Sequence, residues 1–327
     1  MSTYHTLLTQ DVYQAAALIR QGELVAFPTE TVYGLGADAF NPTAVRKIFE
    51  AKGRPLDNPL IVHIARIDQL DRLVTVIPEA AHRFMARFFP GPLTLVLPRH
   101  PDVPDAVTAG LPTVGVRMPR HPVARAFLEA CNTPVAAPSA NRSGRPSPTR
   151  WEAVYADLNG RIACILQGNR SDMGLESTVV DCTGPTPVVL RAGAVPLEAL
   201  RQVVPETRPV GPEESLKARS PGTRYRHYAP CARVVLVDHP NEAIPGPHHA
   251  YIGLDAPSCP EAFGACCICP DVETYAYELF DFFRRCDAQG CTRIYAQRVP
   301  RTGLGWALMD RLERAATPEA GNLPEAF

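Results

Sequence analysis

The sequence predicts an α/β protein with two domains, and three observations lead to this fold class. The chain has 327 residues, more than one hydrophobic core usually serves. Through its first two hundred residues, short apolar runs alternate with stretches of helical periodicity. From Pro205 to Pro230 this periodicity disappears, and a second series of strands and helices follows. We therefore expect domains at 1–206 and 232–327, joined by a linker at 207–231.

Strands are expected where short β-branched or aliphatic runs are bounded by turn residues, and helices where apolar residues recur with a period of 3.6. The first domain is expected to contain, as strands, Leu24–Phe27, Leu60–Ile64, Leu93–Leu97, Val114–Arg117, Val135–Ala136, Ile162–Leu166, Thr178–Asp181 and Val188–Arg191. Its expected helices are Val12–Gln21, Pro42–Lys52, Ile77–Phe88, His121–Ala130 and Thr149–Leu158. The second domain is expected to contain strands Arg233–Val237, Ala250–Leu254, Ala265–Cys269 and Arg293–Gln297, and helices Thr274–Asp287 and Gly305–Arg314.

The helix Pro42–Lys52 has the clearest boundaries. Asn41 is a favourable N-cap residue, proline suits the first helical position, and Gly53 suits the position just past the end. Val45 begins the apolar stripe, and Lys52 continues it seven residues later. The lysine is therefore expected to point toward the sheet.

Composition narrows the class of protein. The apolar fraction is 46% and mean hydropathy is close to zero, which is typical of soluble globular proteins. The formal net charge of −1 gives no bulk attraction to nucleic acid or to a membrane. No signal peptide and no apolar run of about 20 residues is visible, so a cytoplasmic protein is expected.

The ten cysteines are scattered, so a disulfide framework is not expected. Three of them, Cys266, Cys267 and Cys269, lie in an apolar run that we interpret as a core strand. No second cysteine or histidine pair accompanies them, so no metal site is predicted.

The turn Lys52-Gly53-Arg54-Pro55 is the first candidate for chemistry. The chain has only three lysines, so a lysine here does not follow from a lysine-rich composition. Two cations two residues apart repel each other, and an anion between them, such as polyphosphate, would relieve that cost. The alternative is a surface lysine whose stem covers apolar neighbours.

Further polar residues follow the ends of expected strands, where ligands of open α/β sheets bind. They are the turn at 28–31, Arg117, the turn at 139–141 and Arg191. Arg117 shares a strand face with a glycine, which leaves room for a carboxylate. The alternatives are ordinary capping and turn chemistry. His63, within a strand, is equally interpretable as a hydrogen-bonded core residue.

The linker concentrates basic and aromatic residues, which a plain tether does not need. They are Arg219, Arg224, Tyr225, Arg226, His227 and Tyr228. Such residues anchor a ring or a phosphate, so the linker is expected to act as a lid, with a passive tether as the alternative. Neither GxGxxG nor GxxxxGK[ST] occurs. The residues alone thus indicate a nucleotide-binding α/β enzyme.

Three motifs together carry a resemblance to a known family. Lys52-Gly53-Arg54-Pro55, Ser139-Ala140-Asn141 and Arg226-His227-Tyr228 resemble the YrdC-like family, specifically its two-domain threonylcarbamoyl-AMP synthases. The resemblance extends over nearly the whole chain. It implies a twisted, open, mixed sheet with helices and a large basic cavity, followed by a smaller Rossmann-like α/β domain.

The resemblance also implies an activity. Such proteins condense L-threonine, bicarbonate and ATP into threonylcarbamoyl-AMP and pyrophosphate, which makes them nucleotidyltransferases. A separate transferase complex then passes the threonylcarbamoyl group to an adenosine in tRNA. Mg²⁺ is expected to arrive with ATP, without a dedicated protein cage.

The resemblance assigns roles residue by residue. Lys52 and Arg54 would be catalytic through charge stabilisation. The threonine-binding set would be Thr31, His63, Arg117 and Ser177. The ATP-binding set would be Arg54, Asn58, Thr113, Ser139, Asn141, Ser147, Arg191 and His227.

Two other classes compete with this interpretation. An RNA-binding module using the same basic cavity would bind RNA with steep salt dependence and without ATP turnover. The near-neutral charge and the lack of an RNA motif argue against it. A carbamoyltransferase-type maturation factor would carry zinc-finger cysteine pairs, and this chain has none.

Overall fold

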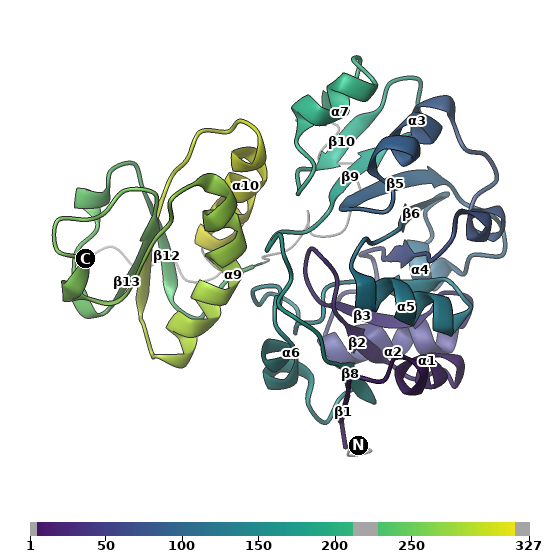
Figure 1. The fold of residues 1–327 in the computed structure, drawn as a ribbon, viewed down its shortest axis with the longest axis horizontal. Coiled ribbons are helices and arrows are strands. Elements are labelled where there is room, and N and C mark those ends of the chain that lie inside the picture. The colour runs from purple at the N-terminus through teal and green to yellow at the C-terminus, as the bar shows by residue number, and fades with distance from the viewer. Residues whose placement is uncertain (1–4, 212–227, 318–327) are drawn as a thin grey trace.

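The computed structural model describes residues 5–211 and 228–317. Within them the chain forms two bodies, a larger one from the N-terminal part and a smaller one from the C-terminal part (Figure 1). Each is built on its own sheet. The predicted α/β class, with a smaller α/β unit after the first, is confirmed. The linker boundaries at 206 and 231 stay predictions, since 212–227 lie outside the described residues.

The elements of the larger body are strands and helices mixed along the chain, without strict alternation. Its strands are β1 (Leu7–Thr9), β2 (Val25–Phe27), β3 (Gly34–Asp38), β4 (Ile61–His63), β5 (Leu93–Pro98), β6 (Thr113–Arg117), β7 (Val135–Ala137), β8 (Cys164–Leu166), β9 (Thr178–Asp181), β10 (Val188–Arg191) and β11 (Arg208–Pro209). Its helices are α1 (Val12–Arg20), α2 (Pro42–Lys52), η1 (Ile67–Arg72), α3 (Glu79–Phe88), α4 (Asp105–Thr108), α5 (Pro122–Cys131), α6 (Trp151–Leu158) and α7 (Leu197–Val203).

The large sheet is mixed, with strand order β1-β8-β2-β3-β7-β4-β6-β5-β9-β10-β11. β4 lies at its centre, antiparallel to β7 and parallel to β6. In this register His63 pairs with Arg117 on β6 and with Val135 on β7. Residues more than fifty positions apart along the chain therefore meet at one strand end, where the functional cavity lies.

β3 was not predicted, because its sequence Gly-Leu-Gly-Ala-Asp lacks the β-branched residues of a typical strand. The glycines allow close packing instead. A Cβ on Gly36 would lie 2.7 Å from a methyl group of Val135, and one on Gly34 would lie 3.1 Å from the Phe27 ring. The strand is thus specified by tertiary contacts that local propensity does not reveal.

Helix α2 has the predicted ends. The Asn41 side chain accepts hydrogen bonds from the amides of Thr43 and Ala44, and Gly53 closes the helix in the left-handed conformation at φ 63°. The Lys52 side chain is buried, as its place on the apolar stripe predicted. The helix therefore delivers an amine into the interior beside the sheet.

The smaller body has a four-stranded parallel sheet of order β12-β15-β13-β14. Its elements are β12 (Arg233–Val237), η2 (Pro240–Glu242), β13 (Gly246–Gly253), η3 (Pro260–Ala262), β14 (Phe263–Ile268), α9 (Val272–Ala288), β15 (Arg293–Gln297) and α10 (Leu304–Ala316). The two long helices cover the side of this sheet that faces the larger body (Figure 1). The cysteine run lies on the edge strand β14 and just beyond it. Cys266 is exposed and Cys269 is buried, so only part of that run packs in a core.

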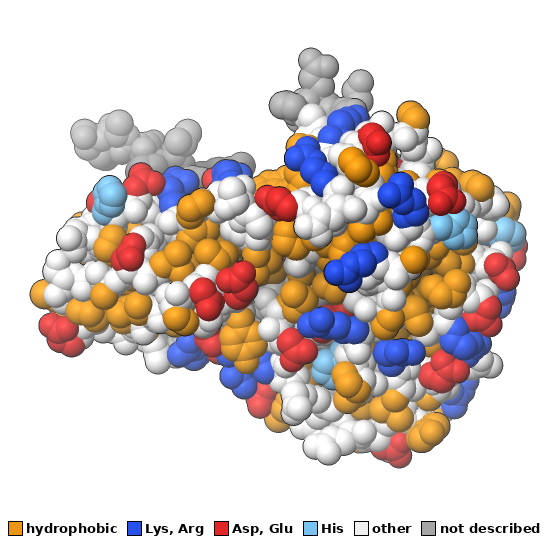
Figure 2. Space-filling model, turned by 45° about the horizontal axis from the view of Figure 1, so that its top comes forward, with side chains coloured by type: hydrophobic (Ala, Val, Ile, Leu, Met, Phe, Trp, Pro, Cys, Tyr) orange, Lys and Arg blue, Asp and Glu red, His pale blue; other side chains and the backbone are white. Residues whose placement is uncertain are grey.

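Ion pairs join the two bodies. Arg284 on α9 donates to Asp157 on α6 at 2.8 Å, and Arg170 donates to Glu278 on α9 at 2.9 Å. On the outer face shown in Figure 2, Lys and Arg side chains alternate with Asp and Glu, in keeping with the near-zero net charge. Among the described helices, none has the length and apolarity needed to cross a membrane.

Candidate active site

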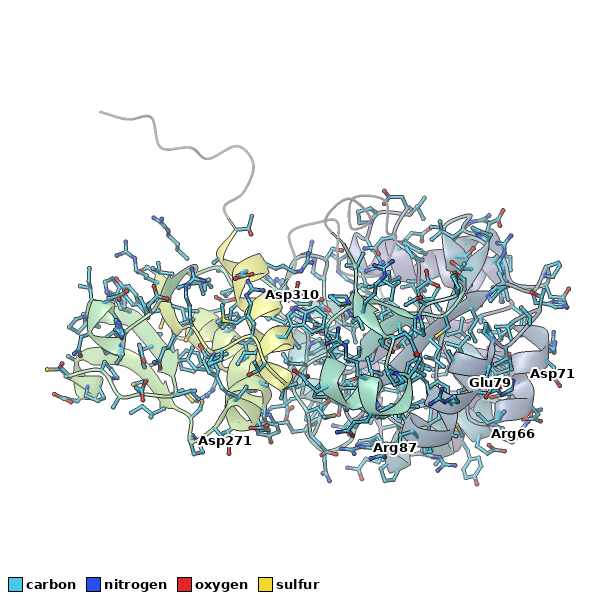
Figure 3. The ribbon with its side chains drawn as sticks, turned by 90° about the horizontal axis from the view of Figure 1, so that it is seen from above. Arg66, Asp71, Glu79, Arg87, Asp271 and Asp310 are labelled. Carbon is cyan, nitrogen blue, oxygen red and sulfur yellow. The ribbon has the colours of Figure 1, made fainter. Side chains whose placement is uncertain are left out.

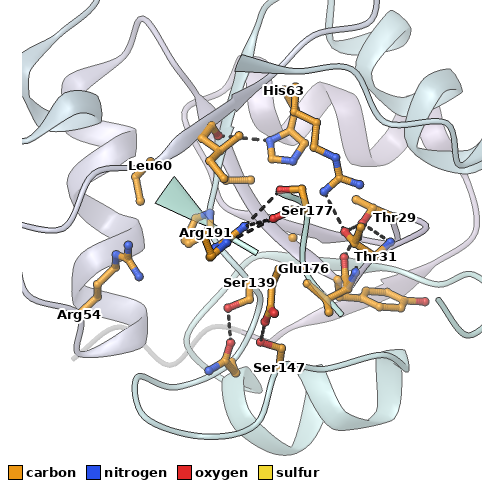
Figure 4. A pocket seen from close by; sticks show the side chains of 18 of the residues that line it. Thr29, Thr31, Arg54, Leu60, His63, Ser139, Ser147, Glu176, Ser177 and Arg191 are labelled. Carbon is orange, nitrogen blue, oxygen red and sulfur yellow. Dashed lines mark hydrogen bonds between the residues drawn. The ribbon is translucent and has the colours of Figure 1, made fainter. Parts of the chain in front are cut away.

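A cavity opens in the larger body where the ends of β2, β4, β6 and β10 approach the loop after β7. The space between its walls, part of it open to solvent, is about 670 Å³. Figure 4 shows Arg54 on one side and Thr29 and Thr31 on the other, with Ser177 and Arg191 between them. Nine of the residues that line it were predicted for function: Thr31, Arg54, His63, Arg117, Ser139, Asn141, Ser147, Ser177 and Arg191.

A directed chain of hydrogen bonds forms the threonine-lined side. Thr29 Oγ1 donates to the carbonyl of Val32 at 2.6 Å, so its only hydroxyl hydrogen is used. The 2.8 Å contact between the two threonine hydroxyls must therefore be donated by Thr31. Arg117 Nη1 in turn donates to Thr31 Oγ1 at 2.8 Å. Thr31 consequently offers a ligand an oxygen lone pair, which suits a ligand with a hydroxyl or ammonium donor.

Arg117 has a buried acidic partner that was not predicted as a site residue. Glu30, in the turn after β2, lies 2.8 Å from Arg117 Nη2, and both side chains are almost fully buried. Burial alone would raise the pKa of Glu30, but the Arg117 charge holds that pKa below its usual range. Glu30 lies in the turn at 28–31, which was a candidate for function, but a glutamate in such a turn is usually exposed. The pair leaves this side of the cavity close to electrically neutral.

His63 lies beside Arg117 at the end of β4. Its Nδ1 is 3.2 Å from the carbonyl of Ile61, and the Phe27 ring packs edge-on at 5.8 Å. Burial, reinforced by the Arg117 charge, lowers the pKa of His63 to about 3. The imidazole is therefore neutral at physiological pH. His63 was interpretable either as a core residue or as a site residue. The structure shows that it is buried and also lines the cavity.

The opposite side of the cavity carries an excess of positive charge. Arg54 folds back on its own turn, with Nη2 donating to the carbonyls of Asn58 and Pro59 at 3.3 and 3.1 Å. Burial and the nearby charge of Arg191 lower the pKa of Arg54 to about 10. Burial also lowers the pKa of Arg191. Cations whose pKa values are depressed in this way mark a place where an anion would be stabilised.

Lys52 lies behind the cavity wall and anchors one of its loops. Its ammonium donates to the carbonyl of Ser139 at 2.6 Å and also to the carbonyl of Asn141. Burial and the Arg54 charge lower the pKa of Lys52 well below its usual value. Within the loop, Ser139 Oγ donates to Asn141 Oδ1 at 2.6 Å (Figure 4). Lys52 thus fixes the loop and adds to the positive charge nearby.

The floor between the two sides is built from the strands β9 and β10. Arg191 Nη2 donates to the Ser177 carbonyl at 2.9 Å and to its hydroxyl at 3.2 Å. Gly193 allows this approach, because a Cβ there would lie 2.3 Å from the backbone of Ser177 and Thr178. Ser177 belongs to the predicted threonine-binding set and Arg191 to the predicted ATP-binding set, so the two predicted sets adjoin at this point.

Some predicted residues lie elsewhere. Asn58 is buried outside the cavity wall, and neither polar atom of its side-chain amide has a hydrogen-bond partner among the described residues. Thr113, half-buried, begins β6 at the end opposite Arg117 and does not line the cavity. His227 lies outside the described residues. The next residue, Tyr228, does line the cavity.

Several lining residues were not assigned a ligand role from the sequence: Tyr33, Arg145, Glu176 and Tyr228. Glu176 is the most consequential, since its carboxylate accepts a hydrogen bond from Ser147 at 2.6 Å (Figure 4). Glu176 directly precedes Ser177, and this adjacency to a predicted residue was the only indication in the sequence that it belongs to the site. Tyr228 was recognised as part of a basic and aromatic linker and of the motif Arg226-His227-Tyr228, without a ligand role of its own.

The acidic residues do not offer a resident metal site. Glu30 is paired with Arg117, and Glu176 lies 2.8 Å from a C-terminal arginine, Arg311. Within 5–211 and 228–317, no group of three or more His, Cys, Asp or Glu side chains is placed to hold a metal ion. A Mg²⁺ ion would therefore fit here only together with a ligand that supplies oxygens of its own.

The fold and cavity define a class: two-sheet α/β proteins whose polar cavity combines a charge-balanced side with a cationic one. Comparison with known proteins then identifies the family. The chain belongs to the Sua5/YciO/YrdC family, described as telomere recombination, which matches residues 17–193. The threonylcarbamoyl-AMP synthase C-terminal domain family matches residues 195–317. The resemblance stated from the sequence is confirmed.

Relatives match over nearly the full chain. The threonylcarbamoyl-AMP synthase of Pyrococcus abyssi is 46% identical over 92% of this chain and 93% of its own length. That of Bacillus subtilis is also 46% identical, over 93% of this chain and 92% of its own length. The crystal structure of P. abyssi Sua5 complexed with L-threonine superposes with a TM-score of 0.87 at 43% identity, covering 95% of this chain and 96% of that one.

Proposed function

We propose that this protein is a threonylcarbamoyl-AMP synthase, a nucleotidyltransferase that uses L-threonine, bicarbonate and ATP and releases pyrophosphate. The observation that carries the proposal is the division of one cavity into a charge-balanced side and a cationic side that meet at Ser177 and Arg191. Its relatives carry this activity in their names, and one has been crystallised with L-threonine. The product would pass to a separate transferase complex that modifies tRNA.

Threonine would occupy the side formed by Thr31, His63, Arg117 and Ser177. An amino acid is a zwitterion, which suits a site where Arg117 is already balanced by Glu30. Arg117 donates to Gly91 through Nε and to Thr31 through Nη1. Its Nη2 lies within ion-pair distance of Glu30 but has no hydrogen-bond partner among the described residues, so its N–H groups can bind the substrate carboxylate. Thr31 Oγ1 would accept a hydrogen bond from the substrate.

ATP would occupy the other side. The triphosphate would offset the charges of Arg54 and Arg191. Burial depresses both of their pKa values, and the Arg191 charge lowers that of Arg54 further. Ser139, Asn141 and Ser147 would provide further polar contacts. Asn58, whose buried amide has no described partner, would gain one from the nucleotide by a small rearrangement of the Arg54 turn. Thr113 and His227 remain candidates from the resemblance alone.

The reaction needs positioning more than it needs a protein acid or base. The threonine amine attacks the carbon of CO₂ and releases a proton to solvent, or it attacks bicarbonate and its proton leaves with the hydroxide as water. Either route gives a carbamate. A carbamate oxygen then attacks the α-phosphorus of ATP, and pyrophosphate leaves. Lys52 and Arg54 would stabilise the negative charge on the carbamate and phosphates. Mg²⁺, held by the triphosphate, would supply additional charge neutralisation.

The test is direct product detection. The protein is incubated with ATP, Mg²⁺, bicarbonate and isotopically labelled threonine, and the mixture is analysed by mass spectrometry for labelled threonylcarbamoyl-AMP. Pyrophosphate is measured in parallel, with threonine omitted as the control. Threonine-dependent formation of both products in equal amounts is expected. ATP hydrolysis to AMP without the mixed anhydride, or no threonine dependence, would refute the proposal.

A further inference from the structure

A buried arginine from the smaller body reaches the wall of the cavity. Arg311 lies on α10, the helix on which Asp310 is labelled in Figure 3 and which lies against the larger body. Its side chain is 0% exposed, the largest side chain among the described residues that is fully buried. A cation in such a place requires several partners.

The partners of Arg311 come from both bodies. Nε donates to Glu176 Oε2 at 2.8 Å, Nη2 donates to the Ala192 carbonyl at 2.9 Å, and Nη1 donates to Asp310 Oδ2 at 2.6 Å. The guanidinium also lies over the Tyr228 ring, 5.2 Å from its centroid. Glu176 and Tyr228 line the cavity, and Ala192 directly follows the lining residue Arg191.

Glu176 needs this partner because of where it lies. Its other oxygen, Oε1, accepts the hydrogen bond of Ser147, so the two carboxylate oxygens are divided between Arg311 and the cavity wall. Burial would raise the pKa of Glu176, and the charge of Arg311, followed by that of Arg191, keeps it below its usual range. Without Arg311 the Glu176 carboxylate would lose its ion-pair partner and face the side of the cavity that we assign to the triphosphate.

We propose that Arg311 is a positioning residue for the nucleotide side of the cavity. It holds the Glu176 carboxylate in its bond to Ser147 and, through Ala192 and Tyr228, fixes the strand end that carries Arg191. This inference rests on the proposed function, and it gives the smaller body a direct part in the architecture of the site.

A second ion pair across the two bodies provides a matched control. Arg170 is also largely buried, with 9% of its side chain exposed, and donates to Glu278 at 2.9 Å. Its guanidinium likewise lies over a tyrosine ring, that of Tyr277, at 3.7 Å. None of these three residues lines the cavity. Arg170→Met therefore reports the effect of loosening the contact between the bodies, separately from an effect on the cavity.

The experiment compares full-length variants Arg311→Met, Arg311→Lys, Arg170→Met and the double variant Arg311→Met with Glu176→Gln. Binding of ATP and of threonine is measured separately by calorimetry, together with their KM values and the pH dependence of turnover. The double variant removes both charges together, which is commonly tolerated, so the test does not depend on Arg311→Met folding.

We expect Arg311→Met to weaken ATP binding by roughly 10- to 100-fold, the size seen for outer partners that orient contact residues of metal sites. Threonine binding should change less than about twofold, a difference too small for the loss of a direct contact. The ATP-binding defect of Arg311→Met should grow with rising pH as Glu176 ionises. The double variant, which also carries Glu176→Gln, should lack that pH dependence. Arg311→Lys should be intermediate, since it keeps the charge without the forked geometry.

Three results would overturn the inference while leaving the proposed function intact. One is wild-type ATP binding by Arg311→Met. Another is an equal ATP defect in Arg170→Met, which would assign the effect to the contact between the bodies. The third is a parallel loss of ATP and threonine binding that Glu176→Gln does not relieve. A wild-type protein that binds neither substrate would instead refute the proposed function.

Discussion

Replacing Lys52 by methionine tests two separable roles of this residue. The substitution keeps the length of the side chain and removes the amine. The carbonyls of Ser139 and Asn141 then lose a shared donor. A buried acceptor left without a partner costs about 1–3 kcal/mol. Because both residues line an open cavity and methionine avoids the cost of burying an ammonium, we expect the low end, about 2 kcal/mol for the pair.

The stability effect is measured by thermal unfolding. A loss of about 2 kcal/mol corresponds to a fall in Tm of about 4–8 °C for a domain of roughly 200 residues. The matched control is Lys47→Met on the same helix, which breaks a half-exposed pair with Glu23 at 2.9 Å. An exposed pair of this kind contributes about 0–1 kcal/mol, so the control should barely move the Tm.

The chemical effect is measured as pyrophosphate release well below the lowered Tm. Loss of one preorganised charge contact typically lowers turnover by about 10²-fold or more, and we expect that loss for Lys52→Met and none for Lys47→Met. A wild-type Tm for Lys52→Met would refute the loop-anchoring role. Near-normal pyrophosphate release by the folded variant would refute the charge-stabilising role.

Three further predictions concern the threonine side. His63 has a folded-state pKa of about 3 against about 6.5 unfolded, so the unfolded state binds more protons as pH falls below 6.5, and the free energy of unfolding falls by roughly 3 kcal/mol at pH 4. Urea unfolding from pH 7 to 4 should show this slope, and a matching slope in His63→Gln would contradict it. Glu30→Gln removes the charge partner of Arg117 and should lower stability by about 3–5 kcal/mol and raise the KM for threonine, whereas an unchanged midpoint and KM would disprove the pairing. Thr31→Val should reduce the preference for threonine over valine by about 1–3 kcal/mol, measured as the ratio of kcat/KM values, and an unaltered ratio would show that Thr31 does not read the substrate hydroxyl.

Much of the fold was predictable because local rules and tertiary structure agree for its main elements. Helix α2 has its expected N-cap, its left-handed glycine and its apolar stripe, so capping and periodicity fix it without outside help. Strands β1 and β11 are short and were missed. β1 pairs only with β8, more than 150 residues further along the chain, and nothing within its own sequence indicates that pairing.

The cationic and hydroxyl-bearing residues of the site could be predicted from the sequence, whereas its acidic residues could not. Arginines at strand ends, such as Arg117 and Arg191, can be found from periodicity, because a charge that closes an apolar run is conspicuous. Glu30 and Glu176 are surrounded by ordinary turn residues, and their burial depends on arginines distant in the sequence. A carboxylate can be assigned to the site only when its cationic partner is known, and the spacing of residues in the sequence does not identify that partner.

The positions of those carboxylates in turn decide which side of the cavity suits which substrate. Arg117 is matched by Glu30 at 2.8 Å, so a ligand meeting it must itself be close to neutral overall, as a zwitterionic amino acid is. The described hydrogen bonds of Arg54 go to backbone carbonyls, which satisfy its N–H groups without cancelling its charge. A polyanion is therefore favoured on the Arg54 side and disfavoured on the Arg117 side. Arg311 maintains this asymmetry by balancing Glu176, an acidic residue that lines the cavity, from the other body of the molecule.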